Sequence, residues 1–516
     1  MFAPVRTLLT ASTLACGFAL LSITTTPSAH AATGQLEIRA IDKDTGEPVA
    51  VRMHLRNAKG KAVKPPKLPF WHDHFVFDGK VVLDLPVGNY EFEMERGPEY
   101  RSQTGYFTIE RNATDNKEVV MDRFIDMTKH GWWSGELHVH RPLADIELLM
   151  LADDLHVAPV ITWWNDRNPW SDKKPPAEPL VRFATNRYYH VLAGEDEREG
   201  GALLYFGLPE PLPLAGSSRE YPSPVEFLKQ AKAHEGVHVD IEKPFWWDVP
   251  IWVSTGLVDS IGLAHNHMHR GGVLPNEAWG RPRDKARYPD PQGNGRWTTD
   301  IYYHLLNCGL RIPPSAGSAS GVLPNPVGYN RVYVYCGEEL TYEKWFEGLR
   351  TGKVVVTNGP LIRPRVNGEL PGYVFHAGKG EKVELSPALS LSTRDPIDYL
   401  EVVQDGKVVH EVRLDEYAQR KGTLPSVVFE RSGWMLIRAV VTSDNTYRFA
   451  STGPYYVEIG NEPRISRASA QFFLDWVDER AQRVRLDDED QRREVLSHHE
   501  AARKFWQDLV DGANAE

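Results

Sequence analysis

Apolar and polar residues alternate in short runs between Gly34 and Asp122. In QLEIRAID and YEFEME nearly every second residue is apolar, and turns rich in Gly, Pro and Asp, such as KDTGEP, separate the runs. Because the side chains of a strand point alternately to its two faces, this spacing is typical of strands with one buried and one exposed face. We therefore expect residues 34–122 to form a small antiparallel β-sandwich.

The pattern changes between Thr128 and Pro360, where short apolar runs are interleaved with longer stretches of helical spacing. The runs ELHVH, APVITWW and YHVLAGED alternate with segments such as ADIELLMLADDLH and PVEFLKQAKAHE. Repeated strand and helix units predict a parallel sheet or barrel over residues 128–360. In such folds the chemistry gathers at the carboxyl ends of the strands, where His140, Glu195 and His267 would lie.

Strand-like runs return after Pro360, in segments such as KVELSPALSLST and WMLIRAVVTS. They predict a second β-sandwich over residues 361–460. From Ser466 two amphipathic, charge-rich segments predict helices over residues 466–512. These helices would dock on the body of the protein or carry a dimer contact, and the sequence leaves the oligomeric state open.

Residues 1–31 carry the features of a secretory signal peptide. A basic residue precedes an apolar run over residues 8–23, and the small-residue pattern Ala29-His30-Ala31 follows. A lipoprotein signal ending at Cys16 is the alternative, but Thr13 stands where an aliphatic residue is usual. We expect a secreted or periplasmic protein. No other long apolar segment follows, so we expect no transmembrane segment after cleavage.

Charge and cysteine content narrow the functional classes. The chain has 59 Lys and Arg against 70 Asp and Glu, and loss of the signal with its single Arg gives 58 minus 70, or −12. An acidic surface argues against a nucleic-acid partner. Beyond the signal only Cys308 and Cys336 remain, too few for a disulfide scaffold or a cysteine-rich zinc module. The sequence does not decide whether these two pair.

Two histidine clusters indicate a metal site. WWSGELHVHRP contains His138 and His140, which a strand would place side by side on one face. LAHNHMH supplies His265, His267 and His269 at the end of a later predicted strand. Either cluster could be a polar strand end and nothing more, but two of them within one strand and helix array favour convergence on a divalent metal. Glu195, or its neighbour Asp196, would add a carboxylate.

His234-Glu235-Gly236-Val237-His238 matches HExxH, the zinc motif of metalloproteases. That motif needs an uninterrupted helix, whereas Gly236 is expected to end one and VHVDI to begin a strand. We therefore exclude the metalloprotease interpretation. The chain also has no GxSxG, no GK[ST] phosphate loop and no GxGxxG after a predicted strand.

WWSGELHVHRP resembles the first motif of the polymerase-and-histidinol-phosphatase (PHP) superfamily. YYHLLNCGLRIPPSAGS, with NRVYV and VVVTNGP after it, resembles the superfamily's carbaryl-hydrolase-like CehA/McbA branch. The likeness covers about residues 128–370. It implies a distorted (β/α)7 barrel, similar to a TIM barrel, with a two- or three-metal site that hydrolyses phosphoesters, esters, amides or carbamates. In the first segment, Gly88-Asn89-Tyr90 after a strand resembles the transthyretin-like module of carboxypeptidases.

Carried over residue by residue, the resemblance is partial. His138 and His140 match the opening HxH, and Glu195 or Asp196 matches the glutamate after the third strand. The family's Asp-His corresponds to Trp163-Trp164-Asn165, its His-Pro to Lys243-Pro244, and its closing aspartate to Ala319. These positions offer no equivalent ligands, but one or two of His265, His267 and His269 would complete a site for one metal ion, and the sequence leaves the number of metals open.

The multidomain α/β chain therefore has two candidate functions. As a metal-dependent hydrolase it would bind Zn²⁺ or Mn²⁺, with Glu195, Asp196 or Glu242 as proton acceptor and Lys243 stabilising negative charge on the substrate. As a catalytically degenerate barrel it would bind a glycan or peptide instead. For either one, the expected aromatic lining of the pocket, suited to a flat small molecule or a sugar, is Trp163, Trp164, Trp246 and Trp247.

Overall fold

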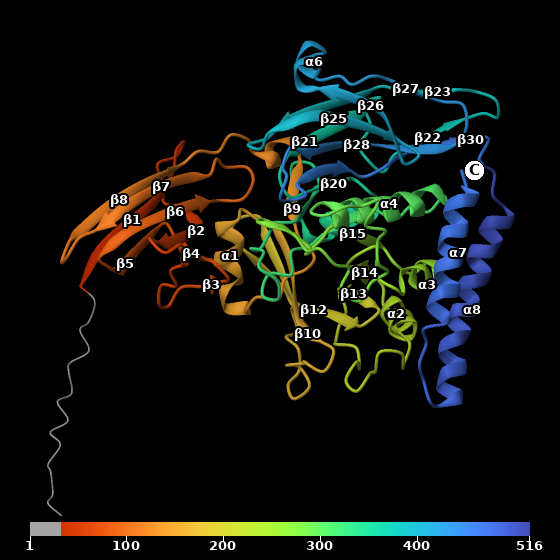
Figure 1. The fold of residues 1–516 in the computed structure, drawn as a ribbon, viewed down its shortest axis with the longest axis horizontal. Helices are drawn as coiled ribbons and strands as arrows, with labels where there is room; N and C mark the ends of the chain where they lie inside the picture. The colour runs from red at the N-terminus through yellow and green to blue at the C-terminus, as the bar shows by residue number, and fades with distance from the viewer. Residues whose placement is uncertain (1–31) are drawn as a thin grey trace, which may run out of the picture.

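The computed structural model describes residues 32–516, the side chain of Asp398 excepted. The predicted signal peptide lies outside the described residues. Figure 1 shows the first strands at one end of the long axis and the last two helices at the other. In the described part of the chain, no helix combines the length and the apolar character needed to cross a membrane.

The N-terminal strands form two sheets around one apolar core. One sheet has the order β5-β1-β8 and the other β3-β4-β2-β6-β7. The alternation that predicted this region is visible in β1, where polar residues face outward and Leu36, Ile38 and Ala40 are buried. The strands are β1 (Thr33–Asp42), β2 (Ala50–Asn57), β3 (Phe70–Trp71), β4 (His74–Asp78), β5 (Lys80–Pro86), β6 (Gly88–Glu95), β7 (Gln103–Ile109) and β8 (Thr114–Met121).

A single large sheet runs through the rest of the molecule in the order β18-β15-β14-β13-β12-β10-β9-β19-β20-β29-β28-β25-β26. Its strands between residues 128 and 360 are β9 (Trp132–Gly135), β10 (Val157–Trp164), β12 (Arg187–Arg198), β13 (Gly201–Phe206), β14 (His238–Ile241), β15 (Ser260–Ala264), β18 (Pro314–Ala316), β19 (Arg331–Tyr335) and β20 (Val354–Thr357). Beyond residue 360 it continues through β25 (Ile397–Gln404), β26 (Lys407–Arg413), β28 (Gly433–Val441) and β29 (Phe449–Thr452).

The remaining strands are short or lie beside this path. β11 (Leu180–Phe183) pairs with β12, and β22 (Val374–Ala377) pairs with β30 (Tyr455–Ile459), which also pairs with β28. Three separate two-stranded pairs are β16 (Met268–His269) with β17 (Gly272–Val273), β21 (Leu361–Val366) with β24 (Pro387–Ser392), and β23 (Val383–Leu385) with β27 (Val427–Phe429).

The predicted (β/α)7 barrel is wrong. Among the described residues, strands predominate over helices and the named strands close no barrel. Two local features explain the difference. The chain reverses at Glu199-Gly200, so that β12, β13 and β14 pair antiparallel rather than through crossover helices. β19 then pairs antiparallel with β9 and β20, which leads the sheet on into the C-terminal strands instead of back on itself.

The helices cover parts of this sheet and one end of the molecule. They are α1 (Ile146–Ala152), α2 (Pro224–Lys232), α3 (Val249–Ser254), α4 (Gly293–Asn307), α5 (Tyr342–Arg350), α6 (Leu414–Gln419), α7 (Arg467–Ala481) and α8 (Glu489–Asp511), with 3-10 turns at Met127–His130 and Leu143–Asp145. α7 and α8 pack on each other and on α3. There Trp506 Nε1 donates to the Pro250 carbonyl at 2.9 Å, and Arg480 is paired with Asp248 and Glu220.

Candidate metal centre

His138 and His140 lie just beyond β9, in an extended segment held on both sides. Leu137 N donates to Ala316 O and His140 N to Ser320 O, each at 2.9 Å, while Ile161 N donates to Val139 O at 2.9 Å. Val139 is turned into an apolar cluster, so the two imidazoles point the other way together. The predicted strand ELHVH is thus shifted, since β9 ends at Gly135, but its extended backbone persists.

A glycine permits the close approach of the chain behind these rings. A Cβ at Gly317 would stand 2.4 Å from the Cβ of His138 and 3.1 Å from its backbone nitrogen, so a larger residue would displace the histidine segment. The glycine of IPPSAGS is therefore required for the packing of this segment. Next to it, Ala319 N donates to His138 O at 2.8 Å, and its methyl group offers no ligand atom.

Three side chains converge from two strand ends. His138 Nε2 lies 3.0 Å from His140 Nε2, and Glu195 Oε2 in β12 lies 3.5 Å from the first and 3.0 Å from the second. A tetrahedral zinc ion with bonds of about 2.0–2.1 Å holds its ligand atoms about 3.3 Å apart, so this spacing fits shared coordination. Among the described residues, this is one of two such groups that could hold a metal ion, and the other is His54, Asp73 and His74.

Glu242, just beyond β14, fixes the orientation of His138. Its Oε1 lies 3.2 Å from His138 Nδ1, and its Oε2 accepts from Lys243 Nζ and, at 3.3 Å, from Trp246 Nε1. If a metal takes the place of the second proton of His138, Glu242 holds the remaining proton at Nδ1 and the metal binds Nε2, which is the atom facing His140 and Glu195. This carboxylate–histidine arrangement is the one that orients metal-binding histidines.

The charges of the group favour a cation. Burial disfavours the imidazolium form of His138, but Glu195 and Glu242 outweigh that effect and raise its pKa to about 10. Burial likewise disfavours ionised Glu195, yet His138 and His140 lower the pKa of its carboxyl to about 2. For His140 burial prevails and lowers the pKa. Two carboxylates thus meet at the rings, with Glu195 Oε2 buried outside any hydrogen bond.

Glu197 is a candidate functional residue that the sequence interpretation missed. It follows Glu195 by two residues in β12, so both carboxyls lie on the same face of the strand. Burial, helped by the charges of Glu195 and Glu242 and opposed by Lys243, raises its pKa to about 7. Asn165 holds its backbone, accepting from Glu197 N at 2.9 Å. The signal was present in GEDERE, where glutamate recurs at every second position, 195, 197 and 199.

His265 and His267 do not join the group, and the expectation that they complete the coordination is corrected. β15 ends at Ala264, and a turn closed by Met268 N to His265 O at 2.9 Å replaces the predicted extended segment. The rings of His265 and His267 have centres 5.7 Å apart and lie outside the group of His138, His140 and Glu195. His265 Nε2 is 2.8 Å from Thr298 Oγ1, and His267 Nδ1 is 3.1 Å from Asn276 O. Protein partners thus engage a ring nitrogen of each histidine, His265 Nε2 and His267 Nδ1.

Asp196 and Lys243 have partners of their own. Asp196 points to the opposite face of β12 from Glu195, where Arg198 holds both of its oxygens at 2.7 and 2.8 Å. Lys243 is buried with its ammonium on Glu242 and 4.4 Å from the centre of the Trp246 ring. The one-residue ambiguity between Glu195 and Asp196 is resolved by the pleat of the strand, which turns only Glu195 toward the histidines.

The four tryptophans divide between the site and the core. Trp164 lies beside His140, with ring centres 5.0 Å apart, and Trp246 touches Glu242 and Lys243. Trp163 is buried and stacks on Tyr205. Trp247 packs against Trp476 and under Arg483 of the C-terminal helices. Trp164 is partly exposed and is therefore the tryptophan that a substrate at the metal group would meet, whereas Trp246 is buried against Glu242 and Lys243.

The structure also shows the HExxH match at residues 234–238 and the two cysteines, Cys308 and Cys336. His234 follows the end of α2, Gly236 has φ +79°, and His238 opens β14, so HExxH does not form one helical face. Cys308 and Cys336 are both free thiols.

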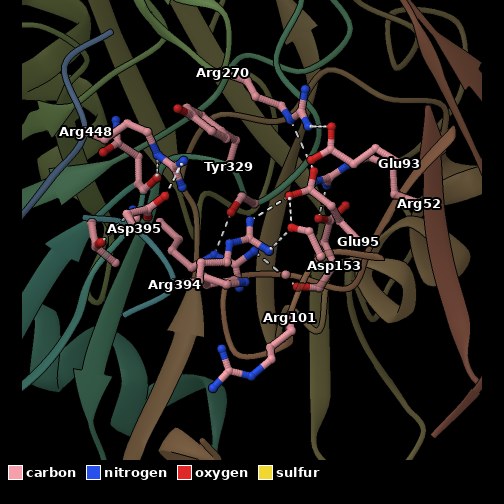
Figure 2. Close-up of a pocket in the computed structure, with 18 residues that line it drawn as sticks. Arg52, Glu93, Glu95, Arg101, Asp153, Arg270, Tyr329, Arg394, Asp395 and Arg448 are labelled. Atoms are coloured by element: carbon pink, nitrogen blue, oxygen red, sulfur yellow. Dashed lines mark hydrogen bonds and ion pairs between the residues drawn. The ribbon is translucent and has the colours of Figure 1, made fainter. Parts of the chain in front are cut away.

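A separate polar cavity of about 550 Å³ lies where the N-terminal strands meet the large sheet. Figure 2 shows its charged side chains paired with one another. Glu95 is the centre of the network, since it accepts from Arg52 at 2.7 Å, Arg394 at 2.6 Å and Arg270 at 3.2 Å, while Arg448 pairs with Asp395 at 2.7 Å. The cavity lining does not include the metal group. Its ion pairs connect the N-terminal sheets to the rest of the chain.

Comparisons with known proteins do not assign a family. No protein-family model matches the chain, and no curated protein matches it. Among solved structures, GBS52, the minor pilin of Streptococcus agalactiae, is similar over 19% of this chain and 47% of its own, with 22% identity and a TM-score of 0.17. The Bacillus anthracis TIE protein is similar over 22% of this chain and 20% of its own, with 24% identity and a TM-score of 0.15. The chain thus spans about half of the pilin and a fifth of the TIE protein, and likeness this slight assigns neither fold nor function.

Proposed function

We propose that this chain is a metal-dependent hydrolase whose metal is held by His138, His140 and Glu195. The observation that carries the proposal is the convergence of two Nε2 atoms and one carboxylate oxygen at 3.0–3.5 Å, with Glu242 orienting His138 from behind. Three protein ligands leave a fourth tetrahedral position for water or substrate, as in catalytic rather than structural zinc sites. The resemblance of WWSGELHVHRP to the first motif of the PHP superfamily supports the same chemistry.

Two nitrogens and one carboxylate oxygen favour Zn²⁺, with Mn²⁺ as the competing ion. A divalent cation at this point supplies a Lewis acid and lowers the pKa of bound water toward neutrality. The protein side chains do the remaining work. Glu242 keeps the Nδ1 proton of His138 in place, and Glu197 lies on the Glu195 face of β12, where it can accept a proton from water.

The charges around the group favour a neutral substrate. Glu195, Glu197 and Glu242 bring three carboxyls to the site, and the ammonium of Lys243 is committed to Glu242. A phosphoester dianion would meet this negative charge, and Lys243 is already paired with Glu242. We therefore propose carboxylic esters or carbamates as the substrate class, with Trp164 beside His140 offering an aromatic wall.

The proposal is tested by metal content and turnover together. The purified protein should carry one equivalent of zinc or manganese at this group and should hydrolyse an aryl ester or aryl carbamate faster than an aryl phosphate. His140→Ala and Glu195→Gln should each remove that equivalent and the activity. His234→Ala is the matched control, because His234 is exposed and outside the group. Metal content unchanged by His140→Ala would refute the proposal.

A non-catalytic binding protein is the second candidate, and Lys243 is the observation that favours it. Its ammonium is already paired within the site, where the resembling family carries a histidine ligand. Bound metal that depends on His140, with no turnover of any of the three substrate types, would select this second candidate.

A further inference from the structure

The N-terminal sandwich contains a second histidine group, far in sequence from the first. β3 and β4 form a hairpin whose two-residue turn is His72-Asp73, and His74 opens β4. β4 pairs with β2, which carries His54. The hairpin thus places an aspartate and a histidine opposite a histidine of the neighbouring strand.

The ligand atoms of this group converge on one oxygen. Asp73 Oδ1 lies 3.2 Å from His54 Nδ1 and 3.3 Å from His74 Nδ1, and the group offers three ligand atoms within 4.8 Å of one another. Ligands of a tetrahedral zinc ion are about 3.3 Å apart, as in the first group. The other oxygen of Asp73 is held by Arg56 at 3.1 Å, so an ion would bind Oδ1 in place of the present hydrogen bond between Oδ1 and His74 Nδ1 at 3.3 Å.

Protein hydrogen bonds do not account for His54. Its side chain is 4% exposed, yet neither ring nitrogen makes a hydrogen bond. The nearest carboxylates are Asp73, at 3.2 Å but outside hydrogen-bond geometry, and Glu95, at 3.8 Å from Nε2. Leaving a buried polar group without a partner is energetically unfavourable. A cation bound at Nδ1 would supply the missing partner.

We propose that His54, Asp73 and His74 form a second metal site, which takes a divalent transition-metal ion such as Zn²⁺. Two imidazoles and one carboxylate are the ligand types that Zn²⁺ prefers. His54 also lines a cavity of about 500 Å³ with Arg56, Glu91 and Tyr106, which gives a path for the ion. Metal at this site ties β2 to the β3–β4 hairpin.

The hairpin connects this second site to the first. Trp71 of β3 donates from Nε1 to Leu323 O at 2.7 Å, and its ring lies 5.5 Å from the guanidinium carbon of Arg141. Arg141 directly follows His140, a proposed ligand of the hydrolytic metal. An ion that fixes the hairpin therefore also fixes the contact between the sandwich and the histidine segment.

The test is zinc stoichiometry of the full-length protein after chelation and titration with Zn²⁺, repeated with Co²⁺ followed by visible absorption. We expect two equivalents in the wild type and one in His138→Ala/His140→Ala. Adding Asp73→Asn to that background should remove the last equivalent, and Asp73→Asn alone should leave one. Asp73 sits in a turn and is partly exposed, so this change is compatible with folding. His72→Asn is the control, since His72 is exposed at φ +50°, a conformation that Asn tolerates, and should retain two.

The outcomes separate this inference from the proposed function. If Asp73→Asn leaves the stoichiometry unchanged, or if His138→Ala/His140→Ala binds no zinc while its circular dichroism remains native, the second site is refuted. If the Asp73-dependent equivalent persists and the His140-dependent one is absent from the wild type, the second site stands and the hydrolytic metal fails. As a further check, Zn²⁺ should raise the melting temperature of His138→Ala/His140→Ala but not that of the variant that also carries Asp73→Asn.

Discussion

Replacing Glu242 with glutamine removes a charge behind His138 while keeping the shape of the side chain. Glu242 Oε1 is 3.2 Å from His138 Nδ1, and the amide oxygen of glutamine can still accept from that nitrogen. On the His138 side, the substitution therefore removes only the charge that raises the basicity of the imidazole. Substitution of a residue that orients a metal-binding histidine weakens metal affinity about 10–100-fold. Because Glu242→Gln keeps the hydrogen bond to His138, we expect its zinc affinity to fall about tenfold, which corresponds to about 1.4 kcal/mol.

The same substitution has a second, separable effect on stability. Lys243 is 3% exposed at its side chain and pairs with Glu242, so Glu242→Gln leaves a buried ammonium without its counterion. Breaking a buried pair from one side costs about 3–5 kcal/mol. Lys243→Met leaves the carboxylate on His138 and should keep zinc affinity within about twofold of wild type. The double variant, with both charges gone, should regain stability but not affinity.

Two assays measure the two effects. Zinc affinity is obtained by competition with a chromophoric chelator, and the free energy of unfolding by urea titration of the metal-free protein. Wild-type zinc affinity in Glu242→Gln would refute the orienting role of this carboxylate. An equal loss of affinity in Lys243→Met would show that the ion pair, rather than the contact with His138, controls the site.

Four further substitutions test other parts of the molecule. Burial opposes ionisation of Glu95, but Arg52 and the neighbouring arginines hold its pKa well below the usual value. Glu95→Gln should therefore lower the free energy of unfolding in urea by about 3–5 kcal/mol. A loss of less than about 1 kcal/mol would show that these ion pairs contribute little to stability. Burial raises the pKa of Asp240 to about 7, so the native state keeps a proton that the unfolded chain releases above about pH 4. Between about pH 4 and pH 7 the free energy of unfolding should therefore fall by up to about 1.4 kcal/mol per pH unit. Asp240→Asn should flatten this decline between unfolding curves at pH 5 and pH 7, and an unchanged slope would exclude Asp240 as its source. A Cβ at Gly194 would stand 1.8 Å from the Trp163 ring. Gly194→Ala should therefore lower the free energy of unfolding by at least about 1–3 kcal/mol, and it should weaken zinc binding because Glu195 is displaced. Wild-type stability and zinc affinity in this variant would show that the Trp163 ring can move aside. Glu197→Gln should lower kcat about 10²–10⁴-fold with zinc content intact, and unaltered kcat would remove it as proton acceptor.

The extended segment around His138 illustrates how much of the candidate site the sequence could predict. HVH placed two imidazoles on one side because any extended backbone does so, even though β9 ends three residues earlier. The same reasoning failed for His265 and His267, where a turn replaces the strand. Both histidine segments were expected to be extended. Only the segment of His138 and His140 is, because its backbone is hydrogen-bonded to segments distant in sequence.

The pairing of Glu195 with the histidines depends on register in the same way. The sequence narrowed the ligand to Glu195 or Asp196. The pleat turns these adjacent side chains to opposite faces, and the pairing of β12 with β10 and β13 fixes which of the two faces the histidines. The same alternation places Glu197 on the face of Glu195. Trp163 and Trp247 show the converse, since tryptophans near strand ends look alike in sequence whether they line a site or fill a core.

The sequence by itself determined the local, periodic features: alternating strands in the first segment, amphipathic helices after Ser466, and an HxH segment able to present two rings together. These follow from the positions of neighbouring residues along one element. Only the tertiary structure decided that the central strands run antiparallel at β12–β13–β14 instead of closing a barrel, and that Glu195 and Glu242 meet His138 while His265 does not. The reason is physical: strand direction, register and the convergence of side chains depend on how separate segments pair and pack, and local alternation carries no record of that pairing.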